Sequence, residues 1–143
     1  MQRRLYRKVQ IKKIKRECNS SLFFDVISMA NFVIRKNQVN NITLTLRERS
    51  QLVNPYYLIV FENNFSTSNV VKYASVLNQA PSNIRYDLVV IEETASPDAL
   101  LGEVRMLVGE WSYKVYESAN QTLDILETTG RILQHGLVIV IED

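Results

Sequence analysis

The stretch that decides the fold is GEWSYKVYES, residues 109–118. It holds the only tryptophan of the chain and two of its seven tyrosines. Successive side chains of a β-strand point to opposite faces, so this stretch carries one face of large apolar residues. Those residues are Trp111, Tyr113 and Val115. The pattern predicts an aromatic, centrally buried strand, entered through a turn at Gly109, on which two packed sheets close.

Short segments with the same two-residue period flank this strand on both sides. We predict strands at residues 31–35, 41–48, 56–61, 70–77, 84–91, 109–118 and 137–141. In residues 41–48, NITLTLRE, the inward residues are Ile42, Leu44 and Leu46. In residues 84–91 we expect one face to consist of Ile84, Tyr86, Leu88 and Val90, opposite Arg85 and Asp87. Residues 100–108 hold one further candidate strand, and residues 119–129 form either a short strand or an irregular crossing.

The turn chemistry agrees with this pattern, because every glycine and proline lies at or beside a predicted boundary. These residues are Gly102, Gly109, Gly130, Gly136, Pro55, Pro81 and Pro97. No amphipathic helix of crossover length separates the strands, which favours a sandwich over a parallel sheet. GEWSY at 109–113 is similar to the immunoglobulin-domain corner where a tyrosine begins the penultimate strand. We therefore predict an all-β, immunoglobulin-like β-sandwich of about seven to nine strands.

The predicted domain lacks two features of antibody domains, the disulfide and the tryptophan on the third strand. Cys18 is the only cysteine, which excludes an intrachain disulfide and a cysteine-based zinc site within one chain. Tyr56 and Tyr57 take the place of the tryptophan on the third strand. A single cysteine also favours a reducing compartment, or a particle assembled inside a cell.

Charge is distributed unevenly along the chain. Residues 1–28 carry eight Lys and Arg against Glu17 and Asp25, a net charge of +6, whereas residues 29–143 carry nine against thirteen acidic residues, a net charge of −4. The basic side chains are Arg3, Arg4, Arg7, Lys8, Lys12, Lys13, Lys15 and Arg16. We divide the chain into a basic N-terminal arm, 1–28, and a sandwich domain, 29–143. The arm orders against a neighbouring subunit, contacts nucleic acid, or is an extension upstream of a natural start at Met29.

Catalytic chemistry is not evident in the sequence. His135, the only histidine, precedes Gly136 in a predicted turn and is interpreted as solvated. The acidic residues near loops are interpreted as a solvated rim; they are Glu92, Glu93, Asp98, Asp124 and Glu127. There is no glycine-rich phosphate loop and no G-x-S-x-G elbow. We therefore predict a protein that is not an enzyme, with no catalytic, cofactor-binding or metal-binding residue and no cofactor.

Most aromatic residues fall at strand spacing and are assigned to the core. Tyr116, on the face opposite Trp111, is the candidate for an exposed contact. No apolar run approaches the ~20 residues that a membrane helix needs, so we expect no membrane partner.

Three segments resemble small immunoglobulin-like structural proteins of tailed bacteriophages, including crAss-like phages. They are ITLTLRERSQLVNPYYLIVF at 42–61, LLGEVRMLVGEWSYKVYES at 100–118 and TGRILQHGLVIVIED at 129–143. The resemblance leaves out residues 1–28, and it brings no catalytic residues with it. It implies a virion component, assembled in the host cytoplasm: a capsid auxiliary or decoration protein, or a neck or tail element. Its implied partners are other virion proteins, the major capsid protein or neck and tail proteins, and it would be present in several copies.

Two other functions remain open. The polar, asparagine-rich loops fit a carbohydrate- or receptor-binding adhesion module. The basic arm fits nucleic-acid contact, because Lys and Arg runs neutralise phosphates without a fold.

Overall fold

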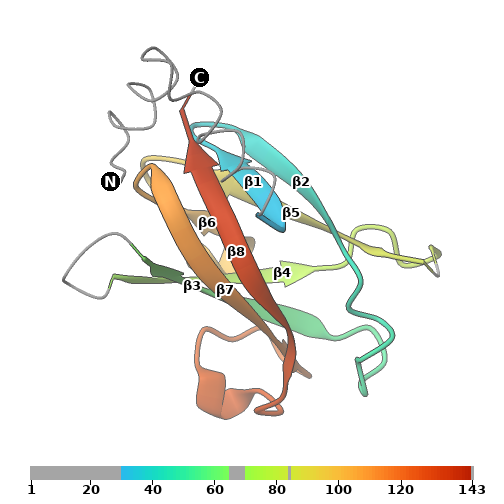
Figure 1. The fold of residues 1–143 in the computed structure, drawn as a ribbon. Coiled ribbons are helices and arrows are strands. Elements are labelled where there is room, and N and C mark those ends of the chain that lie inside the picture. The colour runs from blue at the N-terminus through green and yellow to red at the C-terminus, as the bar shows by residue number, and fades with distance from the viewer. Residues whose placement is uncertain (1–29, 65–69, 84, 143) are drawn as a thin grey trace.

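The chain forms two β-sheets packed face to face, with almost no helix (Figure 1). The computed structural model describes residues 30–64, 70–83 and 85–142. The basic arm and Cys18 therefore lie outside the described residues. The strands are β1 (Phe32–Arg35), β2 (Val39–Leu44), β3 (Tyr56–Asn63), β4 (Val71–Leu77), β5 (Asp87–Glu93), β6 (Glu103–Val104), β7 (Gly109–Ser118) and β8 (Ile132–Ile141). Two short 3₁₀ helices, η1 (Ala99–Leu101) and η2 (Ile125–Glu127), lie in the connections.

The larger sheet has the order β1-β8-β7-β3-β4, and the smaller sheet has the order β2-β5-β6. All pairs are antiparallel except β1 with β8 and β5 with β6. Consecutive strands β1 and β2 belong to different sheets, as do β4 and β5, so the chain crosses between the layers. Two sheets that face each other and exchange strands in this way form a β-sandwich. The predicted all-β sandwich without a disulfide is confirmed.

Strand β7 occupies the position that the sequence indicated. It lies between β8 and β3 in the larger sheet, and its Trp111, Tyr113 and Val115 are fully buried. These side chains pack with Phe61 of β3 and Ile34 of β1 in one core cluster between the sheets. Fully burying a large apolar side chain stabilises a fold by about 1.5–3 kcal/mol, so this row alone is a substantial part of the stability.

The predicted tyrosine corner is wrong in its details. The indole Nε1 of Trp111, and not the Tyr113 hydroxyl, donates to the backbone four residues upstream, at the Leu107 carbonyl oxygen, over 2.9 Å. The Tyr113 hydroxyl instead accepts a 2.7 Å hydrogen bond from Nε2 of Gln134 on β8. Burial raises the pKa of Tyr113, so this phenol remains protonated.

The faces of β5 are the reverse of the prediction. Asp87, Val89, Ile91 and Glu93 point inward, whereas Leu88 and Val90 are half-buried on the other face. The two acidic residues tolerate the interior because each accepts several hydrogen bonds there, as the next subsection describes. The predicted two-residue alternation along β5 is present. The assignment of the charged residues to the outer face is wrong, because Asp87 and Glu93 are buried.

The last strand is longer than predicted, and this changes the surroundings of its glycine. Gly136 and His135 lie within β8, opposite Tyr113 and Lys114 of β7, and not in a turn. A Cβ atom at position 136 would overlap the side-chain oxygen of Asn31, which accepts a hydrogen bond from the Leu137 amide. Gly136 is therefore required by close packing rather than by a bend. His135 is exposed, as expected.

The remaining strands match the prediction except at their ends. Strand β2 begins earlier than expected and stops at Leu44, although Leu46 beyond it is still fully buried. The candidate in 100–108 shrinks to the two residues of β6. Residues 119–129 form the irregular crossing, with η2 inside it.

Candidate docking surface at the loop end

Three loops meet at one end of the sandwich, which we call the loop end: residues 45–55, the described residues of 78–86 and residues 119–131 (Figure 1). Ile84, within the second loop, lies outside the described residues. The register brings them together, because Tyr56 at the start of β3 pairs with Leu77 at the end of β4 and with Ser118 at the end of β7. In variable immunoglobulin domains the binding loops also cluster at one end of the two sheets.

Glu117 of β7 anchors two of these loops. It continues the buried face of Trp111, Tyr113 and Val115, and it is fully buried. Its carboxylate accepts hydrogen bonds from the Ser50 hydroxyl at 2.7 Å, the Gln51 amide at 3.0 Å and the Leu52 amide at 3.2 Å.

The backbone of Glu117 also takes part, because its carbonyl oxygen accepts the Thr129 amide at 3.0 Å. One residue thus holds loops 45–55 and 119–131 against the end of β7. The alternation that runs from Trp111 already places position 117 on the buried face, so an acidic residue there was a readable signal that we did not use.

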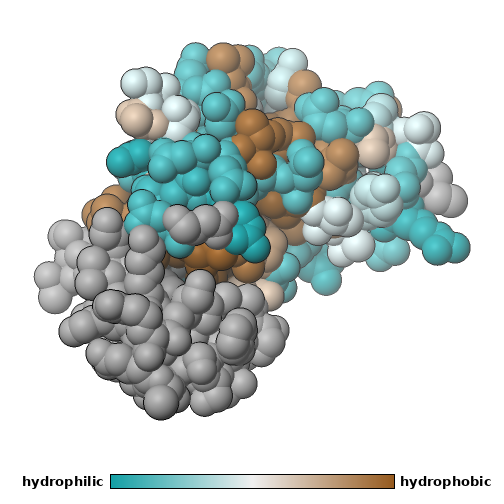
Figure 2. All heavy atoms as spheres, turned by 90° about the horizontal axis from the view of Figure 1, so that it is seen from above, coloured by the Kyte–Doolittle hydropathy of each residue, from teal (hydrophilic) through white to brown (hydrophobic). Residues whose placement is uncertain are grey.

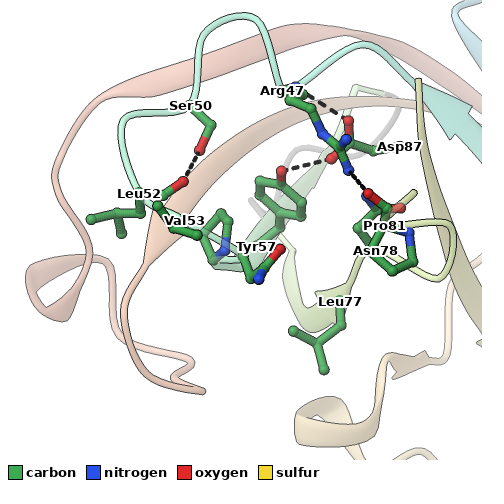
Figure 3. A pocket seen from close by; sticks show the side chains of 11 residues that line it. Arg47, Ser50, Leu52, Val53, Tyr57, Leu77, Asn78, Pro81 and Asp87 are labelled. Carbon is green, nitrogen blue, oxygen red and sulfur yellow. Dashed lines mark hydrogen bonds between the residues drawn. The ribbon is translucent and has the colours of Figure 1, made fainter. Parts of the chain in front are cut away.

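Asp87 of β5 holds the start of loop 45–55 in the same way, through hydrogen bonds to its carboxylate. Its carboxylate accepts the Tyr57 hydroxyl at 2.7 Å and the Arg47 amide at 3.2 Å (Figure 3). The Arg47 guanidinium donates to the Pro81 carbonyl oxygen at 2.9 Å, which links this loop to loop 78–86. Burial, followed by the hydrogen bond to Asp87, raises the pKa of Tyr57 far above its ordinary value, so this hydroxyl is always a donor.

A cleft of about 490 Å³ opens between loops 45–55 and 78–86, and Figure 3 views it from close by. Its lining mixes charged, hydroxyl and amide groups with apolar ones, including Arg47, Ser50, Val53, Tyr57, Asn78 and Asp87. A second cleft of about 410 Å³ lies between the end of β4 and η1, and Leu77 lines both. The volumes are within the range of roughly 300–1,000 Å³ in which small-molecule sites are found.

Apolar side chains project from the loop end into solvent. Val53 and Leu126 are each 91% exposed. Further exposed apolar residues at or next to the loop end are Leu77, Leu123 and Ile132. Scattered single apolar residues are ordinary on a protein surface, but these lie on loops whose backbones are fixed.

The tip of loop 119–131 is fixed by local caps. The Asp124 carboxylate accepts the Leu126 amide at 2.9 Å and so begins η2. The Ser118 hydroxyl donates to the Glu127 carbonyl oxygen at 3.3 Å. Asp124 and Glu127 are exposed, as predicted for a solvated rim. Asp98, also exposed, caps η1 in the same way through the Leu100 amide at 3.1 Å.

Glu93 organises the opposite end of the sandwich, where we expected it to be solvated. It is buried, and its carboxylate accepts the Asn37 amide at 2.9 Å and the Met106 amide at 2.9 Å. Lys36 Nζ forms a 3.1 Å ion pair with it and donates to the Met106 carbonyl oxygen at 2.6 Å.

Burial by itself would raise the pKa of Glu93, but the amides of Asn37 and Met106 and the Lys36 ammonium lower it below its ordinary value. The neighbouring residue Glu92 points to the opposite face of β5 and is exposed, as predicted. Figure 2 views this end from above and shows apolar side chains between hydrophilic ones. Val39, at the start of β2, and Leu107, just before β7, are exposed at this end of the strands.

The other predicted site residues do not converge on one place. Tyr116 is only 8% exposed, so the prediction of an exposed contact there is wrong. All residues from Val115 to Ser118 are buried, because the chain after β7 folds back and bonds to this segment. The arm residues lie outside the described residues.

Among the described residues, no group of three or more His, Cys, Asp or Glu side chains is placed to hold a metal ion. In the same residues, no helix has the length and apolar character to cross a membrane. Comparison of the chain with protein-family models, curated proteins and solved structures finds no match.

Proposed function

We propose that this chain is a non-enzymatic structural protein of a tailed-bacteriophage virion that works by docking to other virion proteins through its loop end. A capsid auxiliary or decoration protein and a neck or tail component are the two roles that fit. Support for the virion comes from the resemblance of residues 42–61, 100–118 and 129–143 to immunoglobulin-like phage proteins. Support for docking comes from the loop end.

The observation that carries the proposal is the pair of exposed apolar residues at positions 53 and 126. Covering a side chain such as Val53 or Leu126 by a partner is favourable by about 1.5–3 kcal/mol. Ordering of loops is one of the main costs of association, at about 0.5–1.5 kcal/mol per immobilised side chain. The Gln51 amide is bonded to Glu117 and the Leu126 amide to Asp124, so the backbone near Val53 and at Leu126 is held in place before a partner binds.

The test is particle association. We would identify peptides of this protein by mass spectrometry in purified particles from the source, and then supply the V53S/L126S double variant in place of the wild type. We expect the wild type in the particles and a loss of about tenfold or more for the variant, which lacks both apolar contacts. The matched control is Leu107→Ser, which removes an exposed apolar side chain from the opposite end.

Either of two results would contradict the proposal. Purified particles that contain no peptide of this protein would refute the virion role. Full incorporation of the double variant, with Leu107→Ser impaired instead, would refute the loop end as the docking surface.

The cleft beside Arg47 favours a second function, a carbohydrate- or receptor-binding adhesion module. It offers two half-buried polar side chains, the Arg47 guanidinium and the Asn78 amide, whereas the Asp87 carboxylate behind them is buried and already bonded. A glycan array with wild type and Arg47→Ala tests it: binding that the substitution abolishes would support adhesion, and no binding would remove it. Nucleic-acid contact by the arm remains a prediction that the salt dependence of binding would test.

A further inference from the structure

Strand β2 has an outer edge to which no other strand is paired. It is the terminal strand of the smaller sheet and pairs with β5 alone. The Glu93 amide donates to the Gln38 carbonyl oxygen at 3.0 Å, so the backbone groups of Gln38 face β5. In an antiparallel ladder alternate residues face the partner, so the N–H and C=O groups of Val39, Asn41 and Thr43 point away from β5. In the part of the chain that the structure describes, nothing bonds to these outward groups.

The neighbouring hydrogen bonds support this orientation independently. The Leu88 and Glu92 amides, opposite Thr43 and Val39, donate to other segments: to the Asn78 side chain at 3.0 Å and to the Gly102 carbonyl oxygen at 3.1 Å. Pairs 43–88 and 39–92 are therefore the non-hydrogen-bonded pairs of the β2–β5 ladder. As far as the described residues are concerned, the outward groups of β2 can pair with another chain (Figure 1 shows β2 at the margin of the fold).

The edge strands of the larger sheet, β1 and β4, have other groups against them, whereas the outer edge of β2 in the smaller sheet has none among the described residues. On β1, the Asn40 side chain accepts the Arg35 amide at 2.8 Å and donates to the Arg35 carbonyl oxygen at 3.1 Å. On β4, Gly102 lies beside the Ser75 carbonyl oxygen, which a Cβ atom at position 102 would meet at 3.4 Å. Strand β2 has no proline, no charged residue and no bulge in its register, which are the usual devices against pairing between chains.

We propose that two copies of this chain pair β2 to β2, antiparallel, about a two-fold axis at Asn41. The register follows from the outward residues, which are all odd-numbered. Centring on Asn41 sets Asn41 opposite Asn41 of the second copy, and Val39 opposite Thr43 of the second copy. Each of the three pairs then exchanges two N–H···O bonds, and the two smaller sheets become one continuous sheet.

A second copy fits this edge better than a strand of arbitrary sequence. The edge VNNITL contains no charge, so self-pairing places no like charges opposite each other. Val39 and Thr43 are both β-branched, and such cross-strand neighbours stabilise a sheet. The contact is isologous, so it closes after two copies and does not propagate into a fibre. It is centred on Asn41, whereas the proposed docking residues are Val53 and Leu126, so different substitutions test the two proposals separately.

The test is the oligomeric state of the full chain. Sedimentation velocity from about 1 to 200 µM should show a dimer whose population rises with concentration. Asn41→Lys puts two positive charges face to face on the axis, so we expect dimerisation to weaken by about tenfold or more. Ser82→Lys, an exposed substitution on loop 78–86, is the matched control and should leave the dimer unchanged.

A cross-link tests the register itself. In a Cys18→Ser background, Asn41→Cys should give a disulfide-linked dimer on mild oxidation, whereas Ser82→Cys should not. Only a contact centred on residue 41 brings two copies of that residue together.

Three outcomes would overturn the proposal. One is a wild type that stays monomeric over the whole concentration range. Another is a dimer that Asn41→Lys leaves intact. The third is a dimer that disappears when residues 1–28 are deleted and that gives no cross-link at position 41. That result would mean that the N-terminal segment, and not the β2 edge of a second copy, makes the dimer contact.

Discussion

Removing the Tyr57 hydroxyl should destabilise the fold by about 2 kcal/mol, because a hydrogen bond to a charged group contributes about 1.5–3 kcal/mol. Tyr57→Phe keeps the ring in the core and deletes only the donor to Asp87. Both groups are buried, with the tyrosine 2% exposed and the aspartate 0% exposed, so water cannot replace the lost bond. Among the described residues, the carboxylate would then retain the Arg47 backbone amide as its donor.

The assay is equilibrium unfolding in urea at neutral pH. For a slope of about 2 kcal/mol per molar urea, a loss of 2 kcal/mol lowers the midpoint by roughly 1 M. A double-mutant cycle with Asp87→Asn isolates the pair, and we expect a coupling of at least about 1 kcal/mol. Tyr73→Phe is the control, since Tyr73 is 36% exposed and its hydroxyl makes no hydrogen bond among the described residues.

The reasoning is refuted if Tyr57→Phe lies within about 0.5 kcal/mol of the wild type, the range of ordinary surface substitutions. A coupling near zero would be equally damaging, because it would mean that the two residues act separately. A loss in Tyr73→Phe as large as in Tyr57→Phe would show that the hydroxyl matters for some reason other than its partner.

Three further substitutions test the packing and the anchors. Because the pKa of Glu93 is lowered in the fold, its contribution is present above the ordinary value of 4.5 and is lost as the pH falls below it; urea midpoints from pH 7 to 3 should drop less steeply in Glu93→Gln. Glu117→Gln should speed hydrogen exchange at the Gln51 amide by about tenfold, measured by mass spectrometry, because a charge-assisted bond contributes about 1.5–3 kcal/mol; unchanged exchange would contradict the anchor. Gly136→Ala should cost about 1–3 kcal/mol in thermal or urea unfolding, because the new methyl group displaces Asn31; the cost should shrink in an Asn31→Ala background, and a full cost there would contradict the clash.

The alternation of apolar residues was enough to predict the sandwich, because inside-outside periodicity is what a two-layer β-fold requires. It placed Trp111 and Tyr113 in the core. It failed where a polar residue is buried with partners far away in the sequence. Asp87 is paired with Tyr57, thirty positions earlier, and Glu93 with Lys36, which no local pattern reveals.

The candidate site was much less predictable than the fold. Positions 53 and 126 are unremarkable apolar residues in the sequence, and only the geometry shows that both project from one end. Tyr116 failed for a related reason: near the end of β7 the chain folds back, so both faces of the strand are covered and the period no longer separates inside from outside.

The carboxylate of Glu117 holds loop 45–55 mainly through backbone amides, and every residue except proline carries one. The identities of the side chains at positions 51 and 53 are therefore decoupled from the attachment of the loop. A library that randomises these positions should retain the fold while changing the chemistry displayed at the tip. The domain is therefore suited as a scaffold for selecting new binders, because the buried Glu117 holds the backbone of loop 45–55 in the same conformation in every member of the library.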